Sequence, residues 1–284
     1  MLKSILASLT GFGSDKPVME TAFAAARIDA GHIEALHTRI DATEVAALAG
    51  MAKSHVYGTM QEIAQNIARE ESERSHAAQR CYSDACSRNA DMGNGGKLVA
   101  SSYREVTTLA NETLYQARLH DLTVAARTPE LARERLDELV VSAGKPVLIA
   151  PAKTPATLGE TVAIAWKDSP EAARAITAAL PILVHAKRVI VVAVSESRIE
   201  QDAEQASAEG LLALLKRHGV SAQLRITAAT STSAAEKIKE IAYEVEADLI
   251  VMGAYGHSRR RELIMGGVTR SLLADCDIAV LMVH

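Results

Sequence analysis

The stretch "TVAIAWKDSPEAARAITAALPIL", from Thr161 to Leu183, decides the fold class of this chain. Its first part, "TVAIAWK", is an apolar run without helical period, which predicts a buried strand. Ser169 is a good N-cap residue, Pro170 suits the first helical position, and Glu171 favours the positive end of a helix dipole. The stretch therefore predicts a buried strand followed directly by a helix.

The same alternation continues through the rest of the second half. Further strands are predicted in "KRVIVVAVSE", "SAQLRITAA", "DLIVMGA" and "IAVLMVH", with helices between them. Gly219 is a C-cap for one helix, and Ser233 with Glu236 forms a capping box at the start of another. Strands that are apolar on both faces and alternate with helices form a parallel sheet covered on both sides, so we expect a three-layer α/β/α sandwich.

The first half repeats this order. "KSILASLTG", "HIEALHTRI", "HDLTVAAR" and "AGKPVLIAPAK" correspond to strands of the second half, and "DKPVMETAFAAARI" to a helix. A long helical region from Ala42 to about Asn89 has no counterpart. We infer an internal duplication: two tandem Rossmann-like domains, residues 1–153 and 160–284, each with a mostly parallel five-stranded sheet. The first is the degenerate copy, and the join falls in "APAKTPATLGET".

The last strand of each half is apolar at nearly every position, in "KPVLIAP" and in "IAVLMVH". An exposed apolar edge strand invites aggregation unless it is paired or covered. We therefore predict that these strands meet and that the halves pack face to face as an intramolecular pseudo-dimer. A homodimer of the whole chain is left open.

Composition narrows the class of protein. The chain has 284 residues, 48% of them hydrophobic, and a net charge of −4, which argues against a bulk nucleic-acid binder. Its three cysteines, Cys81, Cys86 and Cys276, are sparse and lack zinc-ligand spacing, which favours a reducing compartment. No apolar run approaches the roughly 18–20 residues that span a bilayer, and "MLKSILASLTGFGS" lacks a cleavage site. We expect a cytoplasmic protein without a membrane partner.

Four glycines stand in "MGAYGHSRRRELIMGGVT", from Met252 to Thr269. Gly253 and Gly256 follow a predicted strand, whereas Gly266 and Gly267 precede a predicted helix. Ligands of doubly wound sheets bind at the carboxyl ends of the strands, and bare backbone at a helix N-terminus accepts phosphate. The glycines therefore predict a phosphate cradle; the alternative is that they only form tight turns.

Other chemistry finds no matching motif. The chain contains no G-x-x-x-x-G-K-[ST] loop, no G-x-S-x-G elbow and no G-x-G-x-x-G fingerprint. No pair of carboxylates stands out as an acid and base, and neither His76 with Cys81 nor His32 with His37 predicts a metal site. We interpret His257 and the three arginines beside it as part of a solvated loop. Contact between the arginines and a phosphate is the less favoured alternative. We expect a binding protein without catalytic residues.

The spacing G-x2-G-x9-G, followed after one residue by V-T, resembles the nucleotide-binding signature of the universal stress protein family. "VAIAWKDSPEAARA" also resembles that family's first strand and turn. The resemblance covers most of Thr161–His284 and only the outline of the first half, so the chain resembles a tandem universal stress protein. The resemblance implies an α/β fold that binds adenine nucleotide in some members and has lost the site in others.

The resemblance also implies roles for individual residues. In nucleotide-binding members the glycines and the residue after the third glycine hold the phosphates and the ribose. An acidic residue after the first strand contacts the adenine. A backbone position in the second strand lines the base. The residues to which these roles carry over are Gly253, Gly256, Gly266, Gly267, Val268, Thr269, Val194, Lys167 and Asp168.

Two of these positions depart from the family pattern. Gly267 stands where Ser or Thr is usual, which removes a hydroxyl donor and keeps the backbone N–H. Lys167 stands at the acidic position, with Asp168 one residue later, and lysine cannot accept a hydrogen bond from the adenine amino group. The first half has Thr10 at the acid's place and no G-x2-G, so no nucleotide is expected there.

Three functions follow as hypotheses. The first is a cytoplasmic stress-response regulator or sensor whose second half binds ATP or a related adenine nucleotide, with Mg²⁺ accompanying ATP. The second is an interaction protein whose glycine loop is a relic. The third is a slow ATPase.

Overall fold

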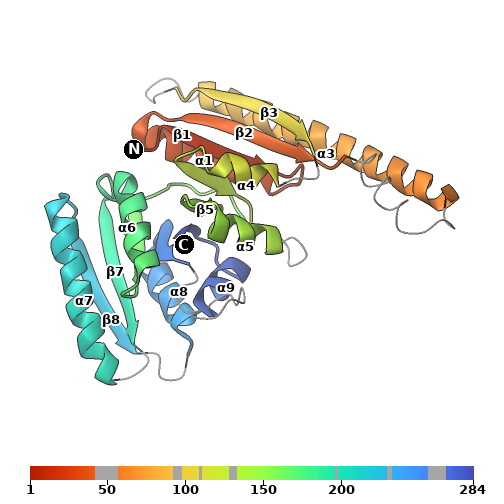
Figure 1. Ribbon diagram of the computed structural model, residues 1–284. Coiled ribbons are helices and arrows are strands. Elements are labelled where there is room, and N and C mark those ends of the chain that lie inside the picture. Colours follow the sequence, from red (N-terminus) through yellow and green to blue (C-terminus); the bar gives the residue numbers. More distant parts are fainter. Residues whose placement is uncertain are drawn as a thin grey trace.

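The computed structural model describes residues 1–41, 57–91, 98–108, 111–127, 133–195, 198–228, 232–254 and 267–284. Within these ranges ten strands form one continuous sheet, with helices on both of its faces (Figure 1). The strand order is β3-β2-β1-β4-β5-β10-β9-β6-β7-β8. Two five-stranded halves therefore share a single sheet.

The first half occupies one end of this sheet and ends with β5. Its elements are β1 (Ser4–Leu9), α1 (Asp15–Asp29), β2 (His32–Arg39), α3 (Tyr57–Asp91), β3 (Ser101–Thr107), α4 (Glu112–Ala117), β4 (Leu122–Ala125), α5 (Arg133–Ser142) and β5 (Val147–Ile149). The long helix α3 extends well beyond the sheet (Figure 1). The helix is confirmed over residues 57–91, whereas residues 42–56 lie outside the described part of the chain. The expectation that it has no counterpart is wrong, because the second half carries the helix Arg198–Arg217 at the same place in the order of elements.

The second half has the same alternation, with a helix of 20 residues in the place of the 35-residue α3. Its elements are β6 (Thr161–Trp166), α6 (Pro170–Leu183), β7 (Arg188–Ser195), α7 (Arg198–Arg217), β8 (Ala222–Ala228), α8 (Ala234–Glu244), β9 (Leu249–Gly253), α9 (Gly267–Ala274) and β10 (Ala279–Val283). The predicted helix signals act as expected. The Ser169 hydroxyl accepts the N–H of Ala172 at 3.1 Å, the capping box of α8 is complete, and Gly219 follows α7 with φ +78°.

The two halves join through their last strands. β5 and β10 pair antiparallel, with Leu148 opposite Leu281, so the predicted meeting of these strands is confirmed. The expected face-to-face packing of the halves is wrong, because they meet edge to edge. Each last strand would otherwise leave backbone N–H and C=O groups unpaired at a sheet edge, and the antiparallel ladder satisfies those groups.

Helices cover both faces of the sheet, which gives the predicted three layers. One core layer lies under α1, α3, α6 and α7, with Phe23, Ile164 and Leu183 fully buried. The other lies under α4, α5, α8 and α9, with Ile190 and Leu272 fully buried. Each half therefore has a parallel sheet between two helical layers, and both cores continue across the join.

The first and fourth strands of the two halves pair in the same way. Val124 of β4 lies opposite Ala7 of β1, and Val251 of β9 lies opposite Ile164 of β6. These four positions fix the correspondence between the halves. The loop after β1 is thereby matched to the loop after β6, and the end of β4 to the end of β9.

Candidate functional site

The candidate site lies at the carboxyl ends of β6, β7 and β9. In the second half β6 is flanked by β7 on one side and by β9 on the other, so the order of the strands reverses between β6 and β9. Ligands of doubly wound sheets bind outside the strand ends at such a switch point. The edge therefore has the topology that the sequence predicted.

The residues that follow β6 are open to solvent at this edge. Lys167 and Asp168 are exposed and lead into the N-cap Ser169 of α6. Trp166 lies opposite Ala193 in β7, which places the end of β6 beside Val194. Lys167 and Asp168 thus follow the end of β6 at the same edge of the sheet as Val194.

Gly253, the last residue of β9, is needed for packing against α6. A Cβ at this position would lie 2.5 Å from the backbone nitrogen of Ala172 and 2.7 Å from the carbonyl carbon of Glu171. Both atoms belong to the first turn of α6, which cannot retreat as a flexible side chain can. The close approach of strand and helix accounts for this glycine, whether or not a phosphate also uses its bare backbone.

The first turn of α9 carries the remaining described residues of the predicted cradle. Gly267 is exposed, Val268 is half-buried, and Thr269 is buried. A Cβ on Gly267 would meet no atom within 4 Å, so the space beside the amino end of α9 is open in the described structure. Gly256 and Gly266 lie outside the described residues, as do His257 and the neighbouring arginines.

Several polar groups at this edge were not predicted. His284 contacts the end of β9, with its Nδ1 3.1 Å from the carbonyl oxygen of Ala254. Arg174 of α6 donates to the carbonyl oxygen of His284 at 3.0 Å and pairs with Glu171 at 2.9 Å. Ser195 at the end of β7 is buried, and its hydroxyl has no hydrogen-bond partner in the described ranges. Sequence reasoning missed these contacts because the meeting of residues so far apart in the chain depends on the tertiary fold.

The corresponding loop of the first half is held by a buried carboxylate. Asp15 accepts the backbone N–H and the hydroxyl of Thr10, both at 2.8 Å, and the N–H of Gly11 at 2.7 Å. Burial raises the pKa of Asp15, although these hydrogen bonds act in the opposite direction. Arg74 of α3 lies over the ring of Phe12, 4.7 Å from its centroid. Helix α3 thus contacts the loop that follows β1 through Arg74, whereas Lys167 and Asp168 after β6 are exposed.

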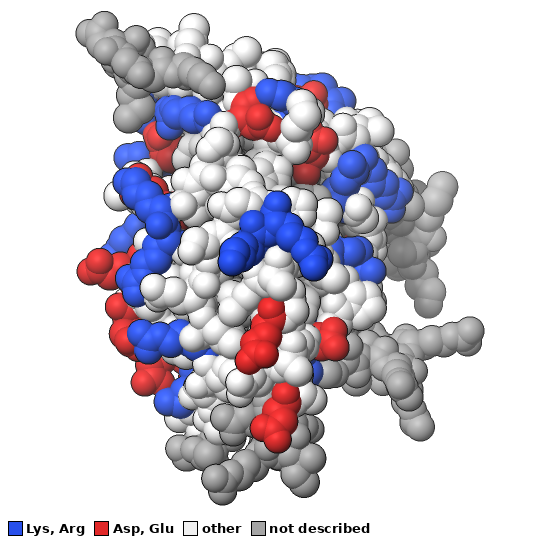
Figure 2. Space-filling model, turned by 90° about the vertical axis from the view of Figure 1, so that its left-hand side faces the viewer, with Lys and Arg blue, Asp and Glu red and all other residues white. Residues whose placement is uncertain are grey.

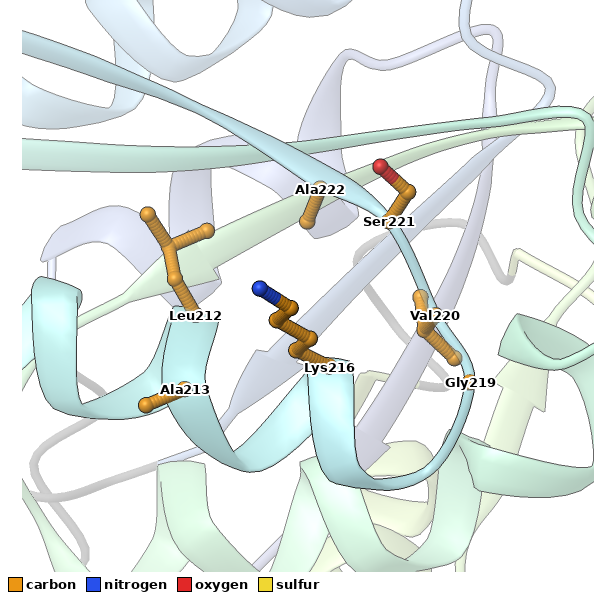
Figure 3. A pocket seen from close by; sticks show the side chains of 7 residues that line it. All are labelled: Leu212, Ala213, Lys216, Gly219, Val220, Ser221 and Ala222. Atoms are coloured by element: carbon orange, nitrogen blue, oxygen red, sulfur yellow. The ribbon is translucent and has the colours of Figure 1, made fainter.

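A pocket of about 430 Å³ lies elsewhere, between the end of α7 and the start of β8 (Figure 3). Leu212, Lys216 and Ser221 are among its lining residues. It belongs to the amino end of β8, opposite the carboxyl edge that carries Lys167, so it is not part of the candidate site.

The surface and the helices give further information on partners. On the face shown in Figure 2, Lys and Arg are interspersed with Asp and Glu. Within the described ranges, no helix is long and apolar enough to cross a bilayer. No group of three or more His, Cys, Asp or Glu side chains in those ranges could hold a metal ion.

The fold and this edge define a tandem, doubly wound α/β protein with a switch-point edge in its second half. The sequence model of the universal stress protein family matches residues 160–284. A universal stress protein from Archaeoglobus fulgidus DSM 4304 is similar in structure, with 14% identity, a TM-score of 0.64, and coverage of 99% of this chain and 95% of that chain. A protein of unknown function from Pseudomonas aeruginosa PAO1 has 14% identity and a TM-score of 0.61, with coverage of 99% and 92%. A search of the curated proteins finds no match.

The match to the universal stress protein family thus covers the second half of the chain. This confirms the resemblance inferred from the glycine spacing. The two solved structures cover nearly the whole chain, and at this level of identity they show the shared fold.

Proposed function

We propose that the second half binds ATP or a related adenine nucleotide at the carboxyl ends of β6, β7 and β9. The observation that carries this proposal is the open space beside Gly267, where an added Cβ would meet no atom of the described residues within 4 Å. This space adjoins the first turn of a helix, whose free N–H groups and positive dipole end attract anions. A phosphate group fits both the space and the charge.

The remaining residues have distinct roles in this proposal. The N–H groups of Gly267, Val268 and Thr269 would hold the phosphates, with Mg²⁺ bound to the phosphates when ATP is the ligand. The backbone of Val194 would line the base. Lys167 would add a positive charge at the same edge. Binding would set the conformation or the partner surface of a regulator in the cytoplasmic stress response.

Calorimetry with ATP tests the proposal, and the single tryptophan offers a second signal. Trp166 precedes Lys167 and donates from Nε1 to the Ser207 hydroxyl at 3.1 Å, so its fluorescence reports on this edge. The decisive variant is Gly267→Val, because the isopropyl group finds room in the protein but occupies the phosphate position. We expect binding to be lost while the free energy of unfolding changes little.

The matched control is Gly210→Val in α7. A Cβ at Gly210 also meets no atom within 4 Å, but this residue lies on an exposed helix face away from the edge. The control should bind ATP as the unchanged protein does. Equal binding by Gly267→Val and the unchanged protein would overturn the proposed site.

The nucleotide content of the purified protein separates the three candidate functions. Bound ATP that persists supports a nucleotide-dependent regulator. Conversion of added ATP to ADP by the protein supports a slow ATPase. An empty protein that takes up no added nucleotide favours an interaction protein with a vestigial site and would overturn the proposal.

A further inference from the structure

Arg127 reaches from the first half of the chain to the last helix of the second half. It follows β4, and its Nη1 donates to the carbonyl oxygens of Leu272 at 2.5 Å and Leu273 at 2.9 Å. These carbonyls belong to the last turn of α9, where helix C=O groups lack partners within the helix. A cation at this end also opposes the negative end of the helix dipole. Arg127 is therefore a C-terminal cap supplied by the other half.

The guanidinium of Arg127 is enclosed at this contact. Its Nε and Nη2 are shielded from solvent and have no hydrogen-bond partner among the described residues. Burial lowers the pKa of Arg127, while the nearby Cys276 and Asp277 act in the opposite direction. The hydrogen bonds that Arg127 does make all go to α9, so the two carbonyl groups are its principal anchor.

Within the part of the chain that the structure describes, this bridge has no equivalent from the second half to α5. The strand register matches Arg127 to Ala254 of the second half, and the methyl group of alanine cannot donate to the equivalent helix α5. Each half caps its own last helix as well: Arg118 donates to Ser142 at the end of α5, and Lys239 donates to Asp275 just after α9. In the described structure, α9 thus receives an added cap from the opposite half.

The helix that Arg127 caps is the helix whose first turn adjoins the candidate site. α9 has eight residues, so its two ends are only about 12 Å apart at 1.5 Å per residue. A helix of two turns moves as one body, because its backbone hydrogen bonds link the first turn to the last. Contacts that fix the end at Leu273 therefore also fix the position of Gly267.

We propose that Arg127 is a positioning residue through which the first half sets the affinity of the second half for the phosphates of its ligand. The inference rests on the proposed function and adds a role for the half that lacks a glycine loop. Arg127 holds α9, and α9 presents its N–H groups to the phosphates. The base, at the ends of β6 and β7, lies outside this linkage.

The test compares Arg127→Met with Arg118→Met in the full chain. Both changes remove a guanidinium that caps a last helix, but Arg118 acts on α5. Calorimetry measures the affinity of each protein for ATP and for adenosine, which has no phosphate. We expect Arg127→Met to weaken ATP on the order of fivefold or more, as for typical coupling between sites, and to leave adenosine unchanged. Arg127→Lys should recover part of the loss, since an ammonium group can still cap α9.

Hydrogen exchange gives a readout that needs no ligand. Arg127→Met should speed exchange of the α9 amides, whereas Arg118→Met should speed exchange in α5 alone. A general loss of stability would weaken ATP and adenosine equally and would overturn the inference, as would unchanged ATP binding by Arg127→Met. If the unchanged protein binds neither compound, the proposed function fails and this inference fails with it.

Discussion

Asp121 and Asp248 hold the starts of equivalent strands in the two halves. Asp121 accepts the N–H groups of Lys3 at 2.9 Å and Ser4 at 3.0 Å, at the start of β1. Asp248 accepts three consecutive N–H groups, those of residues 159–161, at 2.9 to 3.2 Å before and at the start of β6. Each carboxylate precedes the fourth strand of its half and ties it to the first. The duplication therefore includes this aspartate, which ties the fourth strand to the first strand in both halves.

Replacing Asp248 by Asn should destabilise the protein by about 2 kcal/mol, because hydrogen bonds to a charged acceptor contribute about 1.5–3 kcal/mol. The amide keeps the shape but has one acceptor oxygen in place of two. Urea unfolding of Asp248→Asn measures the loss. Asp202→Asn on the exposed face of α7 is the control and should stay within about 0.5 kcal/mol. A similar small effect at Asp248 would contradict the role given to its carboxylate.

Gly253→Ala should destabilise the protein by about 1–3 kcal/mol, the usual effect of overpacking. The new methyl group would lie 2.5 Å from the backbone nitrogen of Ala172, so α6 would have to move. Gly210→Ala is the matched control, since its Cβ meets no atom within 4 Å in a helix. That change should stabilise by about 0.5–1 kcal/mol through lower backbone entropy in the unfolded chain. Thermal unfolding with opposite signs for the two variants is the expected result.

Cys81 should be a poor sensor of oxidants. Burial raises the pKa of its thiol to about 11, and the thiolate is the reactive form. In a variant with Cys86→Ser and Cys276→Ala, alkylation by iodoacetamide should therefore be slow at pH 8 and rise about tenfold for each pH unit up to pH 10. The same variant unfolded in urea should react at the rate of an ordinary thiol. Fast labelling of the folded protein at pH 7 would contradict this prediction, because it would show that the Cys81 thiol is accessible and that its pKa is not raised.

Lys167→Asp should increase the preference for ATP over GTP. The carboxylate can accept a hydrogen bond from the adenine amino group, whereas the ammonium group of Lys167 cannot. ATP binding by the unchanged protein should also weaken steeply with salt, because exposed charges are screened over roughly 10 Å at 0.1 M. Competition binding of both nucleotides at low and high salt measures both effects. A strong preference for ATP that Lys167→Asp leaves unchanged would contradict the position given to this residue.

Strong apolar periodicity made most of the fold predictable. Strands such as β7 and β10 are buried along nearly their whole length, and a continuous apolar run specifies them without help from the rest of the chain. β3 and the short helix α4 were not predicted. All but the last residue of β3 is half-buried, and its sequence "SSYREVT" is mostly polar. Its place depends on partners far away in the sequence, such as Ser75 of α3, whose hydroxyl donates to Glu105 at 2.5 Å.

The sequence predicts which strand ends form the candidate site, but it does not predict which residues hold those ends in place. The spacing of glycines indicates where the backbone must lack side chains. It does not indicate whether a helix or a ligand packs against that backbone. At Gly253 the first turn of α6 packs there. Arg127 gave no signal either. It lies some 145 positions along the chain from Leu272, and only the antiparallel join brings them together.

The antiparallel pairing of β5 with β10 also changes what later substitution can do to this molecule. In a dimer of identical chains every substitution enters the interface twice, since each contact is repeated by symmetry. Here the two partners are encoded separately and remain tethered, so dilution does not separate them as it would two independent chains. One copy could therefore gain a long helix and an arginine, and the other could keep its glycines, without either change being imposed on its counterpart.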